Sequence, residues 1–189
     1  MTTATTGAAN PSPLICALES TYRRRDTKTG PDLRRALRLL PQVPDAQVWA
    51  YVAPYVGRST AAQDTGLLTA ALWAHWHNGY VAPVNGALDV GGAVRRAYPY
   101  DTHDKAYTAL TRADWATLPR ILGPVVGKLA DARTALDWTR LQRDLRAWRE
   151  GNRDAVLKRW SMSLYNPLTA SIAPTAATTT TTDTVKETA

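Results

Sequence analysis

The hydrophobic pattern of this chain repeats with the period of an α-helix over most of its length. In the clearest segment, Trp138, Leu141, Leu145 and Trp148 recur at offsets of 0, 3, 7 and 10 residues. That spacing places the four side chains on one narrow face of a helix. Trp160 falls on the apolar face of the next segment, and we interpret all three tryptophans as core residues rather than as stacking platforms for bases.

Comparable patterns mark further helical segments, which proline, glycine or asparagine residues separate. The segments are residues 31–40, 46–55, 65–78, 104–112, 115–129, 137–150 and 154–165. In residues 65–78, apolar side chains cover nearly the whole circumference, which is typical of a central helix. Residues 84–97, with three glycines, are expected to be looser. The pattern predicts an all-α fold, a single helical bundle of about six or seven helices.

The two ends of the chain lack this periodicity. Residues 1–13 are small and polar, and residues 167–189 are rich in threonine and alanine. Segments of that kind bury too little apolar surface to offset the entropy lost on ordering. We therefore predict a mobile leader at residues 1–13, one helical domain at residues 14–166 and a disordered tail at residues 167–189.

The charge balance is strongly basic. Lys and Arg number 23 against 16 Asp and Glu, a formal net charge of +7, and 18 of the basic residues are arginine. The positive charge is concentrated in residues 20–58 and 112–165. Arginine suits bidentate contacts with phosphate, although a GC-rich genome would also enrich it. Nucleic acid is thus the first partner to consider, and a merely soluble basic protein is the alternative.

The most distinctive basic feature is a helix face formed by Arg34, Arg35 and Arg38, with Asp32 as the only acid within one turn. Like charges at this spacing repel, so a polyanion would relieve a real cost. A solvated helix face is the plainer interpretation. Further candidates for phosphate contacts lie in later segments: Lys105, Arg112, Arg120 and Lys128. A solvated face explains Arg140 and Arg143, so they rank second.

Patterns typical of enzymes do not occur in this sequence. It has no Walker-type glycine-rich loop and no Gly-x-Ser-x-Gly nucleophile elbow. His75 and His77 point to different sides of a helix, unlike the i, i+4 pair of a zinc-binding helix. Cys16 is the only cysteine. We expect no catalytic residue, no metal, no cofactor, no signal peptide and no membrane span, and hence a cytoplasmic protein.

Four stretches form a recognisable set in their order along the chain. They are Asp32-Leu33-Arg34-Arg35-Ala36; Leu67-Leu68-Thr69-Ala70-Ala71-Leu72-Trp73-Ala74-His75; Arg112-Ala113-Asp114 with Leu118 and Arg120; and Leu136-Asp137-Trp138 with Leu141, Asp144, Leu145 and Trp148, followed by Lys158-Arg159-Trp160 and Tyr165. Together they resemble the CasB family, the small subunit of the type I-E CRISPR interference complex, Cascade. The last block is the most specific. Lys105-Ala106-Tyr107 departs from the family, which commonly has an Arg-Phe-type pair there.

The resemblance implies a non-catalytic subunit with a defined place in a larger complex. Such subunits sit as a pair beside the guide RNA backbone and the other Cascade subunits, and they help hold the displaced non-target strand of the target DNA in the R-loop. The candidate phosphate contacts would then be Arg34, Arg35, Arg38, Lys105, Arg112, Arg120 and Lys128. Two alternatives stay open, a helical sequence-specific DNA-binding regulator and a pure assembly scaffold with incidental charge.

Overall fold

Helices make up most of the part of the chain that the structure describes. The computed structural model describes residues 11–24, 26–40, 42, 45–78 and 85–166. In chain order the elements are α1 (Pro13–Arg23), α2 (Thr29–Leu39), α3 (Ala46–Val52), the 3-10 turn η1 (Ala53–Tyr55), α4 (Thr60–Trp76), α5 (Val90–Ala97), α6 (Tyr100–Arg112), α7 (Leu118–Asp131), α8 (Trp138–Ala147), the π-helical turn η2 (Trp148–Asn152) and α9 (Arg153–Tyr165). Within these residues, β-structure is limited to one isolated bridge between Leu88 and Leu136. The predicted all-α class is confirmed.

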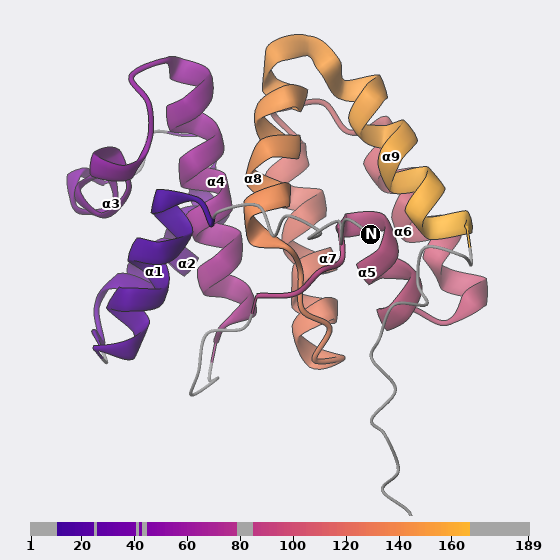
Figure 1. The fold of residues 1–189 in the computed structure, drawn as a ribbon, viewed down its shortest axis with the longest axis horizontal. Coiled ribbons are helices and arrows are strands. Elements are labelled where there is room, and N and C mark those ends of the chain that lie inside the picture. The colour runs from indigo at the N-terminus through magenta and orange to yellow at the C-terminus, as the bar shows by residue number, and fades with distance from the viewer. Residues whose placement is uncertain (1–10, 25, 41, 43–44, 79–84, 167–189) are drawn as a thin grey trace, which may run out of the picture.

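Helix α4 holds the bundle together. It packs against α2 on one side and against α7 and α8 on the other. Figure 1 shows α1, α2 and α3 grouped beside α4, with α5, α6 and α9 gathered beyond α7 and α8. Apolar residues lie all around α4, so the helix can contact neighbours on both sides, as its sequence pattern predicts.

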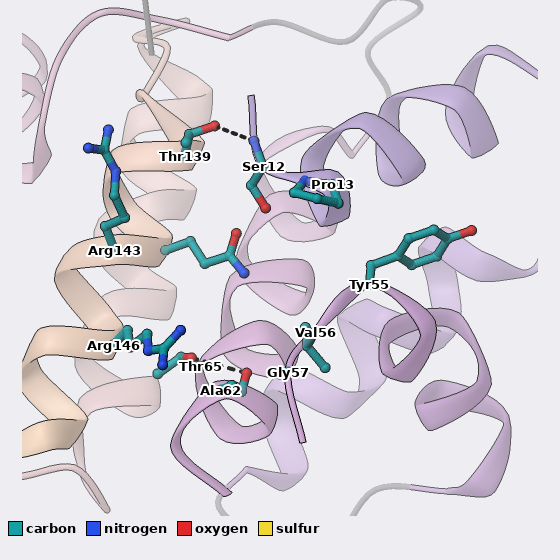
Figure 2. Close-up of a pocket in the computed structure, with 11 residues that line it drawn as sticks. Ser12, Pro13, Tyr55, Val56, Gly57, Ala62, Thr65, Thr139, Arg143 and Arg146 are labelled. Atoms are coloured by element: carbon teal, nitrogen blue, oxygen red, sulfur yellow. Dashed lines mark hydrogen bonds between the residues drawn. The ribbon is translucent and has the colours of Figure 1, made fainter. Parts of the chain in front are cut away.

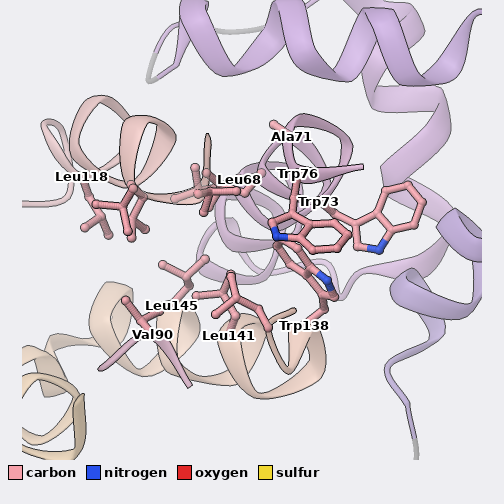
Figure 3. Packing of buried hydrophobic residues seen from close by; sticks show 14 of the residues in the cluster. Leu68, Ala71, Trp73, Trp76, Val90, Leu118, Trp138, Leu141 and Leu145 are labelled. Atoms are coloured by element: carbon pink, nitrogen blue, oxygen red, sulfur yellow. The ribbon is translucent and has the colours of Figure 1, made fainter. Parts of the chain in front are cut away.

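The tryptophans form the centre of the core. Trp138 and Trp160 are fully buried and Trp148 is 4% exposed, which confirms their interpretation as core residues. Figure 3 shows Trp76 of α4 and Trp138 of α8 side by side, and their ring centroids lie 6.4 Å apart. The indole N–H of Trp76 donates to the carbonyl oxygen of Thr134 at 3.0 Å, so this buried donor is satisfied.

Several helices begin at a different residue from the one that periodicity predicts, among them α2 at Thr29 and α6 at Tyr100, and for two others a side-chain hydrogen bond explains the difference. Helix α4 starts at Thr60 rather than at residue 65, because the Ser59 hydroxyl accepts from the backbone N–H of Ala62 and caps the helix. Helix α7 starts at Leu118 rather than at residue 115. The carboxylate of Asp114 accepts from the backbone N–H of Thr117 at 2.8 Å, which holds the intervening residues in a turn.

Helices α1 and α5 lie outside the segments that the sequence pattern marks as helical. Helix α5 occupies the stretch expected to be looser because of its glycines, and it packs against α9. One glycine is needed for that packing. A Cβ atom at Gly91 would lie 1.8 Å from the carbonyl oxygen of Trp160. The glycine therefore permits a close helix–helix approach rather than ending the helix.

We expect Gly91→Ala to lower the free energy of unfolding by about 1–3 kcal/mol, because the new Cβ atom can be accommodated only if the backbone of α9 moves. Gly92→Ala is the matched control on the same helix, where the nearest atom to a new Cβ lies 3.4 Å away. That variant should be neutral or more stable by up to about 1 kcal/mol, the gain in helix propensity. Urea unfolding monitored by circular dichroism measures both, and equal stabilities would contradict the proposed close packing.

The predicted ends of the domain fall partly in the described chain. Pro13 is the first residue of α1, and the backbone N–H of Ser12 donates to the Thr139 hydroxyl at 3.1 Å. Residues 11–13 of the predicted leader are thus joined to the helical domain. Residues 1–10 of that leader and the predicted tail at 167–189 lie outside the described residues.

Candidate nucleic-acid interface

An open groove of about 710 Å³ lies where α2, the end of α4 and the first half of α7 meet. Its polar lining consists of Arg34, Arg35, Arg38, His75, Asn78 and Arg120. Leu37 and three prolines, Pro31, Pro119 and Pro124, provide apolar lining. Four of the predicted phosphate-binding residues, which we call the groove arginines (Arg34, Arg35, Arg38 and Arg120), thus line one surface feature. We call this feature the arginine groove.

Tertiary packing explains why α7 contributes to the groove. Helix α2 contacts both α4 and α7, so the arginine face of α2 lies next to the start of α7. Pro119 occupies one of the first two positions of α7, where its missing N–H costs no helical hydrogen bond. Arg120 follows it directly and is exposed. Residues from two segments far apart in the chain are thereby combined into one basic surface.

Arg34 lies deeper than the other two arginines of α2. It is half-buried, whereas Arg35 and Arg38 are exposed. Its charge acts on Tyr22, whose phenol pKa is raised by burial and partly lowered again by Arg34. A Cβ atom at Gly30 would lie 3.5 Å from Nη1 of Arg34, so the guanidinium folds back toward the start of α2. Partial burial limits the conformational freedom of this side chain before any ligand arrives.

Among the described residues, the groove arginines have no acidic partner. In the described part of the chain, no carboxylate lies within 4 Å of any of them. Several arginines elsewhere do pair with acids: Arg140 lies 3.0 Å from Asp89, and Arg149 lies 3.0 Å from Asp64. Because like charges held together repel, the groove is an unsatisfied positive site that favours an anion.

Arg35 is the groove arginine with the most acidic surroundings. It also lines a small neighbouring cleft with Asp32 and Asp45, although neither acid comes within ion-pair distance. Exposed charges at such separations are weakened by solvent and salt. Their presence reduces the local positive potential at Arg35 more than at Arg38 or Arg120, so we expect these two to contribute more to binding an anion.

His75 is a groove residue that the sequence did not identify as a candidate for binding nucleic acid. Its pKa is lowered mainly by burial and further by the charges of Arg34 and Arg38, while a hydrogen bond with the backbone of Gly123 and the charge of Asp131 act in the opposite direction. The imidazole is therefore neutral near pH 7. His77, in contrast, is buried and stacks on Trp73, so the two histidines do face different sides, as expected.

We expect the affinity of the arginine groove for a single strand of nucleic acid to rise by roughly threefold or more as the pH falls from 7.5 to 5.5. A bound phosphate offsets the repulsion from Arg34 and Arg38, which raises the pKa of His75 in the complex, so binding takes up a proton. Phosphodiesters do not titrate in this range, and the variant His75→Gln should lose the pH dependence. Affinities measured for both proteins across this range test the idea. Parallel pH profiles would show that His75 takes up no proton.

The other predicted contacts lie outside the groove. Lys105 and Arg112 lie on α6, and Lys128 is exposed on α7. None of the three lines the arginine groove. Their role in binding phosphate stays a prediction. Arg140, a second-rank candidate, holds the buried carboxylate of Asp89 and so has a structural task.

Sites of two other kinds are not found among the described residues. No group of three or more His, Cys, Asp or Glu side chains is placed to hold a metal ion there. No helix in that part of the chain is long and apolar enough to cross a membrane.

The fold and the groove define a basic, helical protein with a surface feature that is suited to a polyanion. A family model described as CRISPR-associated protein Cse2 matches residues 31–165, which include all the groove arginines and end with α9. The chain belongs to this family. The resemblance seen in the sequence is thereby confirmed at the level of the family.

Solved structures of related proteins share the fold. CasB from Thermus thermophilus has a TM-score of 0.67 and 22% identity, with 80% of this chain and 95% of that chain covered. Another structure from Thermus thermophilus, of a CRISPR-associated protein of the Cse2 family, gives 0.66 and 21%, with coverages of 80% and 95%. CasB from Thermobifida fusca gives 0.65 and 16%, with coverages of 80% and 93%. A search of curated protein sequences gives no match.

Proposed function

We propose that this chain is a non-catalytic, nucleic-acid-binding small subunit of a type I-E Cascade complex in the cytoplasm. It lies along the guide RNA backbone, in two copies side by side, and stabilises the displaced non-target strand of the R-loop. Its partners are the guide RNA, the target DNA and the other Cascade subunits. Membership of the Cse2 family supports a role in CRISPR function.

The observation that carries this proposal is the arginine groove. Two helices direct four arginines without acidic partners in the described chain into one open surface feature of about 710 Å³. Guanidinium groups form charge-assisted, often bidentate hydrogen bonds to phosphate oxygens. Such contacts fix the position of a nucleic-acid backbone without reading its sequence.

The energetics of R-loops explain why this contact would matter. An RNA–DNA hybrid is about as stable as the DNA duplex that it replaces, so opening the target is nearly balanced. Modest contacts with the displaced strand can then decide whether the loop stays open. Base pairing with the guide reads the sequence, and the subunit needs only a basic surface for the backbone.

Complexes assembled with and without the chain test the proposal. On a matched target, R-loops should last longer when the chain is present, and this advantage should shrink as the salt concentration rises. Equal R-loop lifetimes, together with a lower yield of assembled complex when the chain is absent, would favour the assembly scaffold. Tight binding of the chain alone to one duplex sequence would favour the sequence-specific regulator.

A further inference from the structure

A second pocket lies on a different side of α4 from the arginine groove. It has a volume of about 390 Å³ and lies between α8 and the connection from η1 into α4, next to the start of α1. Figure 2 shows Arg143 and Arg146 on the α8 side, with Val56, Gly57 and Ala62 across from them. Its volume is within the range of about 300–1,000 Å³ typical of sites for small molecules.

Several polar groups around this pocket already have partners. The hydroxyl of Thr139 accepts from the backbone N–H of Ser12, as a dashed line in Figure 2 marks. The hydroxyl of Thr65 donates to the carbonyl of Ala61 at 2.7 Å. Arg146 lies 2.8 Å from Glu150. These groups build the walls of the pocket, and each already makes a bond within the protein.

Three polar groups have no partner among the described residues. Oε1 of Gln142 is buried and accepts no hydrogen bond. The hydroxyl of Ser12 makes no capping bond at the start of α1, although Ser12 occupies the capping position. Arg143 is exposed, lines the pocket and has no carboxylate within 4 Å. A buried acceptor without a partner is unfavourable, and a ligand that donates to Oε1 once the amide turns toward the pocket would remove that cost.

We propose that this pocket binds one unpaired nucleobase of a nucleic-acid strand, whose adjacent phosphate lies on Arg143. The proposal rests on the proposed function only in taking nucleic acid as the ligand. The amide of Gln142 both donates and accepts, as the edges of bases do. Val56, Ala62 and Pro13 provide apolar surface for the faces of the base. Arg143 provides one unneutralised charge for one phosphate.

The chemistry favours a base over a protein segment. A peptide could also form a hydrogen bond with Gln142, but only an acidic peptide would pair with Arg143. The net charge of +7 attracts nucleic acid as well as acidic proteins, so charge alone does not choose between them. The occupant also has to fit a single pocket of about 390 Å³ rather than an extended track. One flat, heteroaromatic ring with hydrogen-bonding atoms on its edge and an anion beside it meets these conditions together.

Nuclear magnetic resonance of the full chain tests the proposal at a residue. The probes are an eight-nucleotide DNA strand of mixed sequence, the matching RNA strand, an abasic DNA strand with the same phosphates, and an acidic hexapeptide. We expect the side-chain amide signal of Gln142 to shift with the DNA strand, the RNA strand or both, which also distinguishes these two sources. It should not shift with the abasic strand or with the peptide.

Gln142→Leu gives the matching affinity measurement. We expect the wild-type protein to bind a base-containing strand roughly 5–10-fold more tightly than an abasic strand. The substitution should remove this difference in affinity and leave the affinity for the abasic strand unchanged. Its melting temperature should not fall, because Oε1 of Gln142 has no hydrogen bond to lose in the described chain. Gln47→Leu, at an exposed glutamine of α3, is the control and should change neither affinity.

The outcomes separate the pocket from the groove. If amides of α2 respond to every strand while Gln142 responds to none, the base pocket is wrong and the proposed function stands. A Gln142 shift caused only by the peptide would identify a protein ligand and overturn the proposal. If neither α2 nor Gln142 responds to any strand, both the pocket and the proposed function fail.

Discussion

Trp148→Ala should lower the free energy of unfolding by about 3–5 kcal/mol, which corresponds to a fall in melting temperature of roughly 6–20 °C for a domain of this size. The Trp148 side chain is 4% exposed, and its ring centroid lies 5.7 Å from that of Trp160. Truncation would leave a large cavity where α8 passes into η2. Urea unfolding followed by circular dichroism measures the loss.

Trp115→Ala is a suitable control for this substitution. Each indole has an arginine over its ring at a similar distance, Arg153 at 5.5 Å for Trp148 and Arg149 at 5.6 Å for Trp115. Trp115 is only half-buried, so its loss should cost clearly less. A Trp148→Ala protein that keeps its stability but loses strand binding would show instead that this ring contacts bases.

Much of the helical architecture follows from periodicity, and the exceptions have local causes. The stripe containing Trp138 and Trp148 predicts the buried face of α8 correctly. It also includes Asp144, three residues after Leu141, and this carboxylate is buried and accepts from the indole N–H of Trp160 at 2.7 Å. An acid on an apolar stripe is the signal that could have predicted a buried polar contact between α8 and α9.

Gly151 and Asn152, rather than hydrophobic spacing, predict the break after that helix, and the non-helical backbone at Gly151 confirms it. The expected helix runs to Glu150, whereas α8 ends at Ala147 and a π-helical turn follows. Gly151 there has a φ of +96°, a conformation that glycine adopts without strain. The stripe continues into the turn because Trp148 still reaches the core, so a pattern of buried residues alone does not reveal the change of geometry.

The candidate site was predictable only as far as single helices allow. One helix face suffices to group Arg34, Arg35 and Arg38. Their assembly with Arg120 depends on α7 packing against α2 and α4, which spacing within one segment does not encode. Predicting that His75 lines the groove would also have required the packing of the helices. A histidine near the end of a buried helix has no sequence pattern that marks it as lining a groove.

Replacing Arg34, Arg35 and Arg38 together by Ala should leave α2 folded and shorten the lifetime of R-loops formed by the whole complex. Alanine is a good helix former, and these side chains have no acidic partners to lose in the described chain. If each of the three arginines contacts one phosphate of a single nucleic-acid strand, the substitution should reduce the magnitude of the slope of the logarithm of the binding constant against log[salt] by about 2 in total. Affinity near physiological salt should fall roughly 10–100-fold.

Two further variants isolate the effect of the groove from that of net charge. Replacing Arg24, Arg58 and Arg96 by Ala removes the same charge from exposed positions outside the groove and should change binding far less. Replacing the three groove residues of α2 by Lys keeps the charge but loses the bidentate fork of arginine. That protein should keep most of the salt slope and recover only part of the affinity.

The sequence of the target decides between the remaining interpretations of the triple variant. Because phosphate contacts do not read bases, the loss should be about equal for unrelated matched targets, and the rules of guide pairing should stay the same. R-loop lifetimes on several targets and at several salt concentrations provide the measurement. A loss confined to one DNA sequence would favour the sequence-reading regulator. Unchanged lifetimes and an unchanged salt slope would exclude this face from the surface that holds the displaced strand.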